Sequence, residues 1–422
     1  MSRRLVAALL AGFLLGPSPL PAQDPPAPAP PAAPASPAAP AGAAFPKGPA
    51  LPWKPAECGK GRLEVLPSGL AILHVAGTPE EMGTQHGTLL RDQVQALMKD
   101  YLPRVLRGKR EDALARARLL ERQIPERHRR EMKALAEAAG VPADDVLLGS
   151  VVVELLGLNQ CSGAAASGPA TRDGRTVVGR NLEWPDHGIL GQYGLMIAAR
   201  PDGLRPFLSA GFPAFAGVVT GMNGDGVFTA ELVVLNEARP DREAALKGVP
   251  YPVLQRRVLE ECGSLAEAVK LVKEASRTVA QNLLLADPAS GIVLECGAGR
   301  CVERPQKDGL VVVTNYYDEA KAPQPGDKRY EGMCTSFAGI GPGGDGVNAA
   351  SMETSMRGAS SSGLAAMMNL QCGVFLPSTL EVRISLGRPP AARRPLVALD
   401  GAALLGVKAP AAREAAAREG SK

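Results

Sequence analysis

Residues 159–168 read Asn-Gln-Cys-Ser-Gly-Ala-Ala-Ala-Ser-Gly and place Cys161 among very small side chains. A structural cysteine in a core strand usually has larger apolar neighbours, because protein interiors are densely packed. The small neighbours predict space around the sulfur, so that another group can approach it. A strand-like segment, Gly-Arg-Thr-Val-Val-Gly-Arg-Asn-Leu-Glu-Trp, follows at 174–184. The stretch therefore predicts that Cys161 begins a strand and that its sulfur takes part in a reaction.

The pattern of the chain changes at Cys161. Before it, Thr78-Pro79-Glu80-Glu81 combines an N-cap, a first-turn proline and a capping-box glutamate, which predicts the start of a helix. Helical periodicity with Pro and Gly breaks predicts further helices at 111–123, 126–139 and 143–156. After it, short β-branched runs predict strands at 175–181, 195–199, 216–222, 227–234, 283–286, 292–296, 301–304, 310–315 and 380–386, and Asn223-Gly224-Asp225-Gly226 predicts a hairpin. Helices are predicted at 252–261 and 265–275, the second opened by a Ser264-x-x-Glu267 box. This order favours antiparallel sheets covered by helices over a parallel doubly wound sheet.

The N-terminal residues have the composition of targeting and linker segments. Residues 1–22 predict a signal peptide, because Arg3-Arg4 precede an apolar run that is too short for the roughly 20 residues of a membrane span. Residues 23–57 are almost entirely Pro and Ala and predict an extended linker. These segments indicate export, to the periplasm or the cell exterior. The remaining chain divides into a helical part at 58–160, a catalytic part at 161–395 and an Ala/Arg-rich tail at 396–422.

Composition disfavours several classes of partner. The net charge of the 422-residue chain is only +4, with both signs interspersed, and aromatic residues make up 4%. Neither feature is typical of a nucleic-acid-binding surface. The chain has no CxxC pair, no His-x-x-x-His spacing and no GxGxxG loop, so we expect no metal and no cofactor.

Seven cysteines in an exported chain leave one without a partner. Cys296 and Cys301 flank Gly-Ala-Gly-Arg between two strand-like runs, which predicts a disulfide across a hairpin. Cys161 is the expected free thiol. The other four can pair, in a connectivity that the sequence does not reveal: Cys58, Cys262, Cys334 and Cys372.

A cysteine nucleophile needs a base, and histidine is the usual one. His187, in Trp-Pro-Asp-His-Gly, is the histidine in the strand-rich part, whereas His74, His86 and His128 fit structural or surface roles. The alternative is cleavage of the bond before Cys161. The new α-amino group, with an unperturbed pKa of roughly 7.7–8.0, is then available to accept the thiol proton.

Cys161-Ser-Gly, followed by Gly-Arg-Asn-Leu-Glu-Trp at 179–184, resembles the N-terminal-nucleophile (Ntn) cysteine hydrolases. Within that class the pattern is similar to the acyl-coenzyme A:6-aminopenicillanic acid acyltransferases and, more distantly, to bile salt hydrolases and penicillin V acylases. The resemblance covers roughly residues 65–395. Its other segments are Gly-Thr-Pro-Glu-Glu-Met-Gly-Thr-Gln-His-Gly at 77–87 and the residues 221–226, 313–316, 328–330 and 376–383.

The resemblance implies an α+β fold, a four-layer α-β-β-α sandwich of antiparallel sheets with a helical N-terminal segment. It also implies a precursor that cleaves itself at Gln160–Cys161 into two subunits that stay associated. Cys161 would be the nucleophile and, through its amine, the base. The implied roles of the remaining residues are to lower the thiol pKa (Arg180), orient the amine in place of the family's Asp (Glu183), donate to the oxyanion (Asn315) and support the site by charge (Arg329).

Each of these residues also has an ordinary structural interpretation. Arg180 and Glu183 fit a surface ion pair, Asn315 a strand-end cap, and Arg329 a solvated turn. Glu231 stands near the place of an Asn in the bile salt hydrolase pattern, so an oxyanion contact there would need a backbone N–H. The matching order of all the residues favours the functional interpretation.

The expected activity is cleavage of an amide or thioester bond in a small-molecule N-acyl substrate through an acyl-thioester on Cys161. Hydrolysis is favoured over acyl transfer, because coenzyme A thioesters are not expected outside the cytoplasm. Two rivals stay open: an amine-accepting acyltransferase, and a tethered binding module without activity.

Overall fold

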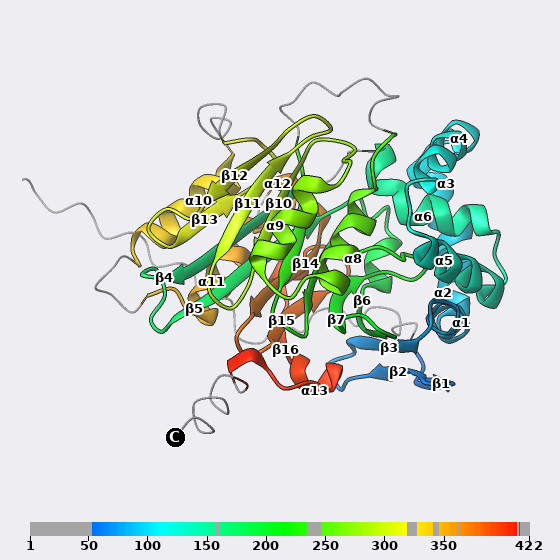
Figure 1. Cartoon of the computed structure of the whole chain (residues 1–422), viewed down its shortest axis with the longest axis horizontal. Helices are drawn as coiled ribbons and strands as arrows, with labels where there is room; N and C mark the ends of the chain where they lie inside the picture. The colour runs from blue at the N-terminus through cyan, green and yellow to red at the C-terminus, as the bar shows by residue number, and fades with distance from the viewer. Residues whose placement is uncertain are drawn as a thin grey trace, which may run out of the picture. The chain divides into compact units, whose positions relative to one another are not determined.

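The computed structural model describes residues 53–156, 160–234, 246–318, 327–340, 346–361, 363–411 and 413, and these form two β-sheets with helices on their outer faces (Figure 1). The expected signal peptide and nearly all of the expected linker lie outside these residues. Within them, no helix is both long and apolar enough to span a membrane.

Sheet A contains ten of the described strands, in the spatial order β1-β2-β3-β6-β7-β8-β9-β10-β11-β12. All neighbours are antiparallel except β3 and β6, which run parallel because helices and sheet B strands separate them in the chain. The strands are β1 Ala56–Cys58, β2 Gly61–Val65, β3 Ala71–Gly77, β6 Leu195–Pro201, β7 Phe207–Gly211, β8 Thr220–Asn223, β9 Phe228–Val233, β10 Gln281–Ala286, β11 Gly291–Cys296 and β12 Cys301–Pro305.

Sheet B contains six described strands in the order β13-β4-β5-β14-β15-β16. Within it, the segment that contains Cys161 (β4) and the Gly-Arg-Asn-Leu-Glu segment (β5) form an antiparallel pair. The strands are β4 Gln160–Gly168, β5 Gly174–Glu183, β13 Leu310–Val313, β14 Asn369–Leu376, β15 Glu381–Leu386 and β16 Val397–Asp400.

The two sheets pack face to face around an apolar core. The rings of Phe228 on β9 and Phe375 on β14 lie 4.8 Å apart across it. Helices α8 (Tyr251–Glu261) and α9 (Leu265–Glu274) cover the outer face of sheet A, and α10 (Lys328–Ala338) and α11 (Ala349–Ala359) cover that of sheet B (Figure 1). The described residues therefore form the expected four layers, α-β-β-α.

The N-terminal helices extend the outer layer on sheet A, where they share an apolar cluster with β3 and β6. The capping box at Thr78 and Glu81 is present as predicted. The expected helical part opens with β1 to β3 instead, and β1 begins inside the range expected to be linker. The helices are α1 Pro79–Leu89, α2 Arg91–Ala96, the π-helical turn Leu97–Tyr101, α3 Leu102–Leu106, α4 Arg110–Glu121, α5 Glu126–Ala139 and α6 Ala143–Leu156.

Two glycines bring α1 unusually close to α5. A Cβ on Gly83 would lie 2.2 Å from the backbone oxygen of Glu131, and one on Gly87 would lie 2.4 Å from that of Leu135. These glycines belong to the Gly-Thr-Gln-His-Gly motif at 83–87. The motif therefore determines how closely α1 packs against α5.

The C-terminal region is more ordered than the sequence predicts. The order continues beyond β15 into β16 and α13 (Gly401–Leu405), where the sequence indicated only an Ala/Arg-rich tail. Helices α10, α11 and α12 (Gly363–Met368) and strand β14 lie in a range without predicted elements. The predicted strand at 216–222 is a loop except for its last residues, which begin β8. The hairpin at Asn223–Gly226 is confirmed, between β8 and β9.

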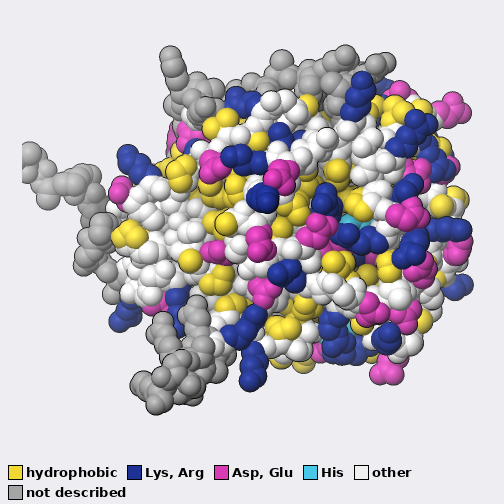
Figure 2. Space-filling view, in the orientation of Figure 1, with side chains coloured by type: hydrophobic (Ala, Val, Ile, Leu, Met, Phe, Trp, Pro, Cys, Tyr) yellow, Lys and Arg dark blue, Asp and Glu magenta, His cyan; other side chains and the backbone are white. Residues whose placement is uncertain are grey.

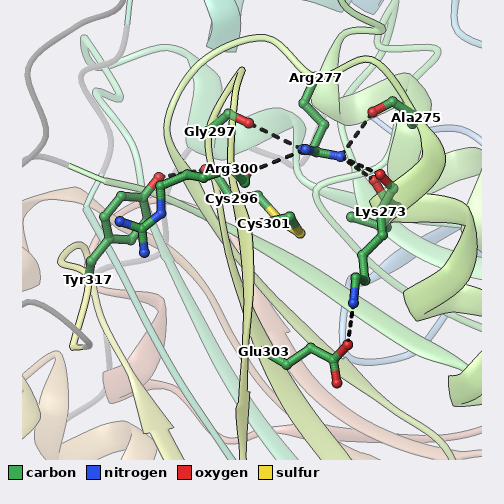
Figure 3. The surroundings of a disulfide bond; sticks show 10 residues. Lys273, Ala275, Arg277, Cys296, Gly297, Arg300, Cys301, Glu303 and Tyr317 are labelled. Atoms are coloured by element: carbon green, nitrogen blue, oxygen red, sulfur yellow. Dashed lines mark hydrogen bonds and ion pairs between the residues drawn. A yellow bond between two sulfur atoms is a disulfide. The ribbon is translucent and has the colours of Figure 1, made fainter.

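The predicted Cys296–Cys301 disulfide is confirmed and joins the ends of β11 and β12 (Figure 3). Around it, Arg277 donates to the carbonyl oxygens of Gly297 and of the last turn of α9. Tyr317 donates from its hydroxyl to the carbonyl of Cys296 at 2.6 Å. The disulfide thus lies in a hydrogen-bonded corner of sheet A.

The expectation of a single free thiol is wrong, because none of the other five cysteines forms a disulfide: Cys58, Cys161, Cys262, Cys334 and Cys372. We expect alkylation of the unfolded chain without reductant to label five cysteines, and seven after reduction. In the native protein the half-buried Cys58 and Cys334 should react before the three buried thiols. Mass spectrometry counts the labels, and only three labels without reductant would contradict the structure.

Positive and negative side chains alternate over the face shown in Figure 2. No broad patch of one sign covers this face. Among the described residues, no cluster of His, Cys, Asp and Glu is placed to hold a metal ion.

Candidate active site

Cys161 lies at the second position of β4, fully buried in the core between the sheets. Its small neighbours are explained by close packing on both faces of β4. A Cβ on Gly163 would lie 2.9 Å from Leu284 of sheet A, while Ala164 and Ala166 pack against α10 and α11. The small residues therefore let the layers approach each other, and they do not leave open space around the sulfur as the sequence suggested.

Arg180 lies on β5 opposite Gly163 and points into the same intersheet core. Its guanidinium donates to the carbonyl oxygen of Glu231 on β9 at 2.6 Å and to that of Asn181. Arg180 therefore bridges the two sheets beside the thiol. A surface ion pair with Glu183 is ruled out.

Burial raises the pKa of the Cys161 thiol to about 11. The nearby Arg180 guanidinium lowers this pKa, whereas the carboxylates of Glu183 and Glu231 raise it. In the uncleaved chain the group is consequently a protonated thiol at neutral pH, and reaction requires a proton acceptor.

Asn315 and Arg329 hold the peptide groups of Cys161. The Cys161 N–H donates to Asn315 Oδ1 at 2.8 Å, and Arg329 Nη1 donates to Asn315 Oδ1 and to the Cys161 carbonyl, both at 3.0 Å. The Asn315 Nδ2 group donates to the Val233 carbonyl at 2.7 Å. Arg329 lies buried in the first turn of α10 and not in a solvated turn. Asn315 therefore lies against the peptide group of Cys161, and its amide donor is already bonded to Val233 in the intact chain.

Two residues that the sequence analysis missed position this pair. Asn282 on β10 donates to the carbonyls of Thr314 and Tyr316, at 3.0 and 2.8 Å, on either side of Asn315. Asp327 accepts from Arg329 Nε and Nη2, at 3.1 and 3.0 Å. Nothing in the local sequence marks Asn282 or Asp327 as part of the site. Their contacts with residues 314–316 and with Arg329 depend on how β10 and α10 pack in the folded chain.

Glu183 projects from β5 toward the helix layer, on the opposite face from Arg180. Its Oε1 accepts from Ser360 at 2.6 Å and Asn369 at 3.1 Å, and its Oε2 lies 3.7 Å from Arg329 Nη1. Burial raises the pKa of this carboxyl, and Arg329 lowers it. Glu183 is thus connected to the Cys161 backbone through Arg329, and Ser360 and Asn369 are partners that the sequence analysis missed.

The Glu231 side chain is fully buried on β9. Its backbone N–H donates to the Val219 carbonyl at 3.2 Å, so this donor does not point at the thiol as an oxyanion contact would. Glu231 contributes instead by accepting from Arg180 through its carbonyl.

The histidines have contacts elsewhere. His187 is exposed, with its ring 6.1 Å from that of Tyr101. His74 contacts Glu64, His86 accepts from the Ala214 N–H, and His128 contacts Glu260. The structure therefore gives no support to a Cys161–His187 pair.

An apolar pocket begins beside the candidate nucleophile. Leu182, which lies directly opposite Cys161 in the β4–β5 ladder, lines it together with Trp184. The other walls are the π-helical turn Leu97–Tyr101, helix α6 and the loop Phe212–Phe215, and the cavity between them has a volume of about 70 Å³ and is partly open to solvent. π-Helical turns are frequent at functional sites. The pocket combines residues from both sides of the Gln160–Cys161 bond.

Two facing sheets between helix layers, with a cysteine at the second position of one strand, are the arrangement that the resemblance to the Ntn hydrolases implies. Residues 171–338 match the family model of acyl-coenzyme A:6-aminopenicillanic acid acyl-transferase, which confirms the resemblance inferred from the sequence.

Curated relatives resemble the chain at moderate identity. An uncharacterized protein of Archaeoglobus fulgidus is 27% identical over 315 residues, covering 61% of this chain and 52% of the relative. Protein dcd1B of Dictyostelium discoideum is 27% identical over 243 residues, covering 51% of this chain and 47% of the relative. The chain thus spans about half the length of these relatives.

Solved structures share the arrangement only distantly. A Caenorhabditis elegans ortholog of N-acylethanolamine-hydrolyzing acid amidase is 18% identical, with a TM-score of 0.44 over 57% of this chain and 100% of that one. Penicillin V acylase from Agrobacterium tumefaciens is 14% identical, with a TM-score of 0.41 over 57% and 86%. A mutant of conjugated bile acid hydrolase from Clostridium perfringens is 14% identical, with a TM-score of 0.41 over 59% and 95%.

Proposed function

We propose that the protein is an exported precursor that cleaves itself between Gln160 and Cys161 and then hydrolyses the amide bond of a small N-acyl substrate through an acyl-thioester on Cys161. The observation that carries the proposal is the set of hydrogen bonds around Cys161. Asn315 accepts from the Cys161 N–H, and Arg329 donates to the Cys161 carbonyl and to Asn315. Every buried peptide group needs hydrogen-bond partners, but those of Cys161 include an amide and a guanidinium side chain, and a second buried arginine lies beside its sulfur. A nucleophile that becomes a chain terminus needs both.

In the first stage, the Cys161 sulfur attacks the carbonyl carbon of Gln160. A C–S bond forms, the C–N bond to Cys161 breaks, and the departing nitrogen receives the thiol proton. Water then hydrolyses the thioester, which leaves the Gln160 carboxylate and a Cys161 with a free thiol and a free α-amine.

In the second stage, the α-amine takes the thiol proton and the thiolate attacks the substrate carbonyl. The amine of the substrate leaves with a proton from the Cys161 ammonium, and water releases the acyl group from sulfur. Arg180 favours the thiolate by opposite charge. The base is therefore the residue's own amine, which is consistent with histidines that have contacts elsewhere.

Glu183 is suited to orient that amine indirectly, because its carboxylate lies beside Arg329, which is bonded to the Cys161 carbonyl. One carboxylate oxygen is held by Ser360 and Asn369, and the other has no hydrogen-bond partner among the described residues. Asn315 Oδ1, already bonded to the Cys161 nitrogen, is the nearer acceptor. Asn315 would then exchange its bond with the Val233 carbonyl for one with the oxyanion.

The two products of cleavage are expected to stay associated. The parallel β3–β6 ladder joins a strand that precedes the cleavage site in the chain to one that follows it. Arg256 on α8 likewise forms a buried ion pair with Glu131 on α5. Separation would expose the ladder edge and leave buried charges unpaired, which is costly. The disulfide supports an oxidising compartment outside the cytoplasm.

The pocket indicates the substrate class. Its lining is almost entirely apolar, and Leu182 connects it to Cys161. Burial of apolar surface favours the binding of an acyl chain, with a free energy of roughly 25 cal/mol per Å² of apolar surface buried. We therefore assign the pocket to an apolar acyl group, with the amine part of the substrate outside it.

Gly149 on α6 tests this assignment. A Cβ there would make ordinary contacts, 3.6 Å from Met98 Cε and 3.7 Å from the Ala214 oxygen. Gly149→Ala should keep or raise the free energy of unfolding, by up to about 1 kcal/mol, because glycine is unfavourable inside a helix. Gly149→Leu should lower kcat/KM for long-chain acyl amides about tenfold or more and spare acetyl amides, since the added side chain occupies the pocket. Kinetics with an acyl series checks this, and an equal loss for all chain lengths would contradict the assignment.

The proposal as a whole is tested by intact mass and end-group sequencing of the purified protein, together with turnover of N-acyl amides. Two chains, with the larger beginning Cys-Ser-Gly-Ala-Ala, are expected. The family model favours a second candidate, transfer of the acyl group to an amine, and added amine would then divert product from the free acid. Failure of a thiol-reactive acyl analogue to label Cys161 would favour the inactive binding module.

A further inference from the structure

The loop Phe212–Ala216, which forms one wall of the apolar pocket, is held in an unusual conformation. Ala214 has a φ of +64°, in the left-handed region that non-glycine residues seldom adopt. Such a conformation persists only where surrounding contacts maintain it. The pocket wall therefore depends on the groups that hold Ala214.

Those groups come from the other side of the cleavage site. The Ala214 N–H donates to His86 Nε2 on α1 at 3.3 Å. Ser150 on α6 donates to the Ala214 carbonyl at 3.5 Å and accepts from the Ala216 N–H at 3.3 Å. Arg256 on α8 donates to the Ala216 carbonyl at 2.8 Å. Two residues of the expected small subunit thus hold a wall that belongs to the large one.

His86 is suited to this contact by its chemistry. It is buried, and burial, with the nearby Arg256 charge, lowers its pKa to about 4. The ring is therefore neutral at physiological pH, and its Nε2 lone pair is available to accept from Ala214.

The helix that carries His86 is fixed on both sides of this residue. Gly83 and Gly87 allow the close approach of α1 to α5. Gln85 is bonded to both the N–H and the carbonyl of Ala76 on β3, each at 2.8 Å. The motif at 83–87, to which the chemistry of Cys161 assigns no role, therefore presents His86 to Ala214 in a fixed position.

We infer that His86 is a positioning residue for substrate binding: together with Ser150 it holds the Phe212–Ala216 wall and so sets the affinity for long apolar acyl chains. The inference rests on the proposed function, in which the pocket receives the acyl group. It extends that function by making acyl-chain selection depend on contacts between the two cleavage products.

The test compares the mature wild type with His86→Leu, which removes the acceptor but keeps an apolar side chain. We expect KM for a dodecanoyl amide to rise about tenfold, the size of one lost buried hydrogen bond, with kcat little changed. An acetyl amide, too short to reach the wall, should keep its KM. His86→Gln, which retains an acceptor, should restore much of the long-chain KM, and Ser150→Ala should act in the same direction as His86→Leu.

His74→Gln is the matched control, because His74 is equally buried in the same part of the chain but contacts Glu64 instead of the pocket wall. It should lower the melting temperature and leave the ratio of long-chain to short-chain kcat/KM unchanged. If His86→Leu also leaves that ratio unchanged, or if His74→Gln lowers it equally, the inference is overturned.

A binding measurement separates this inference from the proposed function. Dansyl-undecanoic acid is titrated into the wild type and His86→Leu, with fluorescence as the readout. If the wild type turns over no acyl amide, the proposed function fails. In that case weaker probe binding by His86→Leu still supports the role of His86, and equal affinities overturn it.

Discussion

The Cys161→Ala variant is expected to remain a single chain of unprocessed length, with no measurable turnover of any N-acyl amide. The sulfur is the attacking atom in both self-cleavage and acyl transfer, so its removal abolishes both. Cys161→Ser keeps a weaker nucleophile and should cleave slowly, with a much larger loss of turnover. Intact mass and steady-state kinetics measure the two effects.

Cys372→Ala is the matched control for this variant. Cys372 is also a fully buried thiol in sheet B, but it packs against α11, on the opposite face of the sheet from the Cys161 side chain. It should cleave and turn over like the wild type. If the wild type is fully active while Gln160 is still joined to Cys161, the α-amine cannot be the base and the mechanism is wrong.

The second large effect is expected from Asn315→Leu, which keeps the branching and the number of heavy atoms of the side chain. It removes the acceptor for the Cys161 nitrogen and the amide that we assign to the oxyanion. Loss of one oxyanion donor lowers kcat by roughly 10²–10³-fold in enzymes where it has been measured. We expect a loss of this size in kcat, slower self-cleavage and a smaller change in KM.

Asn348→Ala controls for stability in this experiment. Asn348 caps α11 with its side chain, far from Cys161 in the chain, and loss of a cap costs about 1 kcal/mol. It should lower the melting temperature with kcat unchanged. An Asn315→Leu enzyme with wild-type kcat would remove Asn315 from the oxyanion role.

The elements predicted best from the sequence are those with local signals. The helix after Thr78 begins with a capping box, and α9 begins with the predicted bond from the Glu267 N–H to Ser264. The hairpin at Asn223–Gly226 is formed by bonds from Asp225 and Val227 to the Asn223 side chain. Each signal acts within a few residues, so it is readable in a single sequence.

Elements without local signals were missed. Strand β14 joins sheet B between β15, which follows it in the chain, and β5, which lies almost 200 residues earlier. Helices α10 and α11 bury methionines and a phenylalanine against β4 and β5, a face that only the sheet defines. The small residues around Cys161 were interpreted as access to sulfur, whereas their size is required by the layers above and below.

The order of Cys161, Arg180, Glu183, Asn315 and Arg329 in the sequence was sufficient to predict the class of fold and the candidate site. Reactive and charged residue types in a given order can be recognised along the chain without knowledge of their contacts. Only the tertiary structure decided which atoms meet. It placed Glu183 on the opposite face of β5 from Arg180, connected Asn282 to the backbone on either side of Asn315, and brought His86 to the pocket wall. Such contacts join elements distant in the chain, and their geometry depends on how closely sheets and helices pack, which no local sequence pattern records.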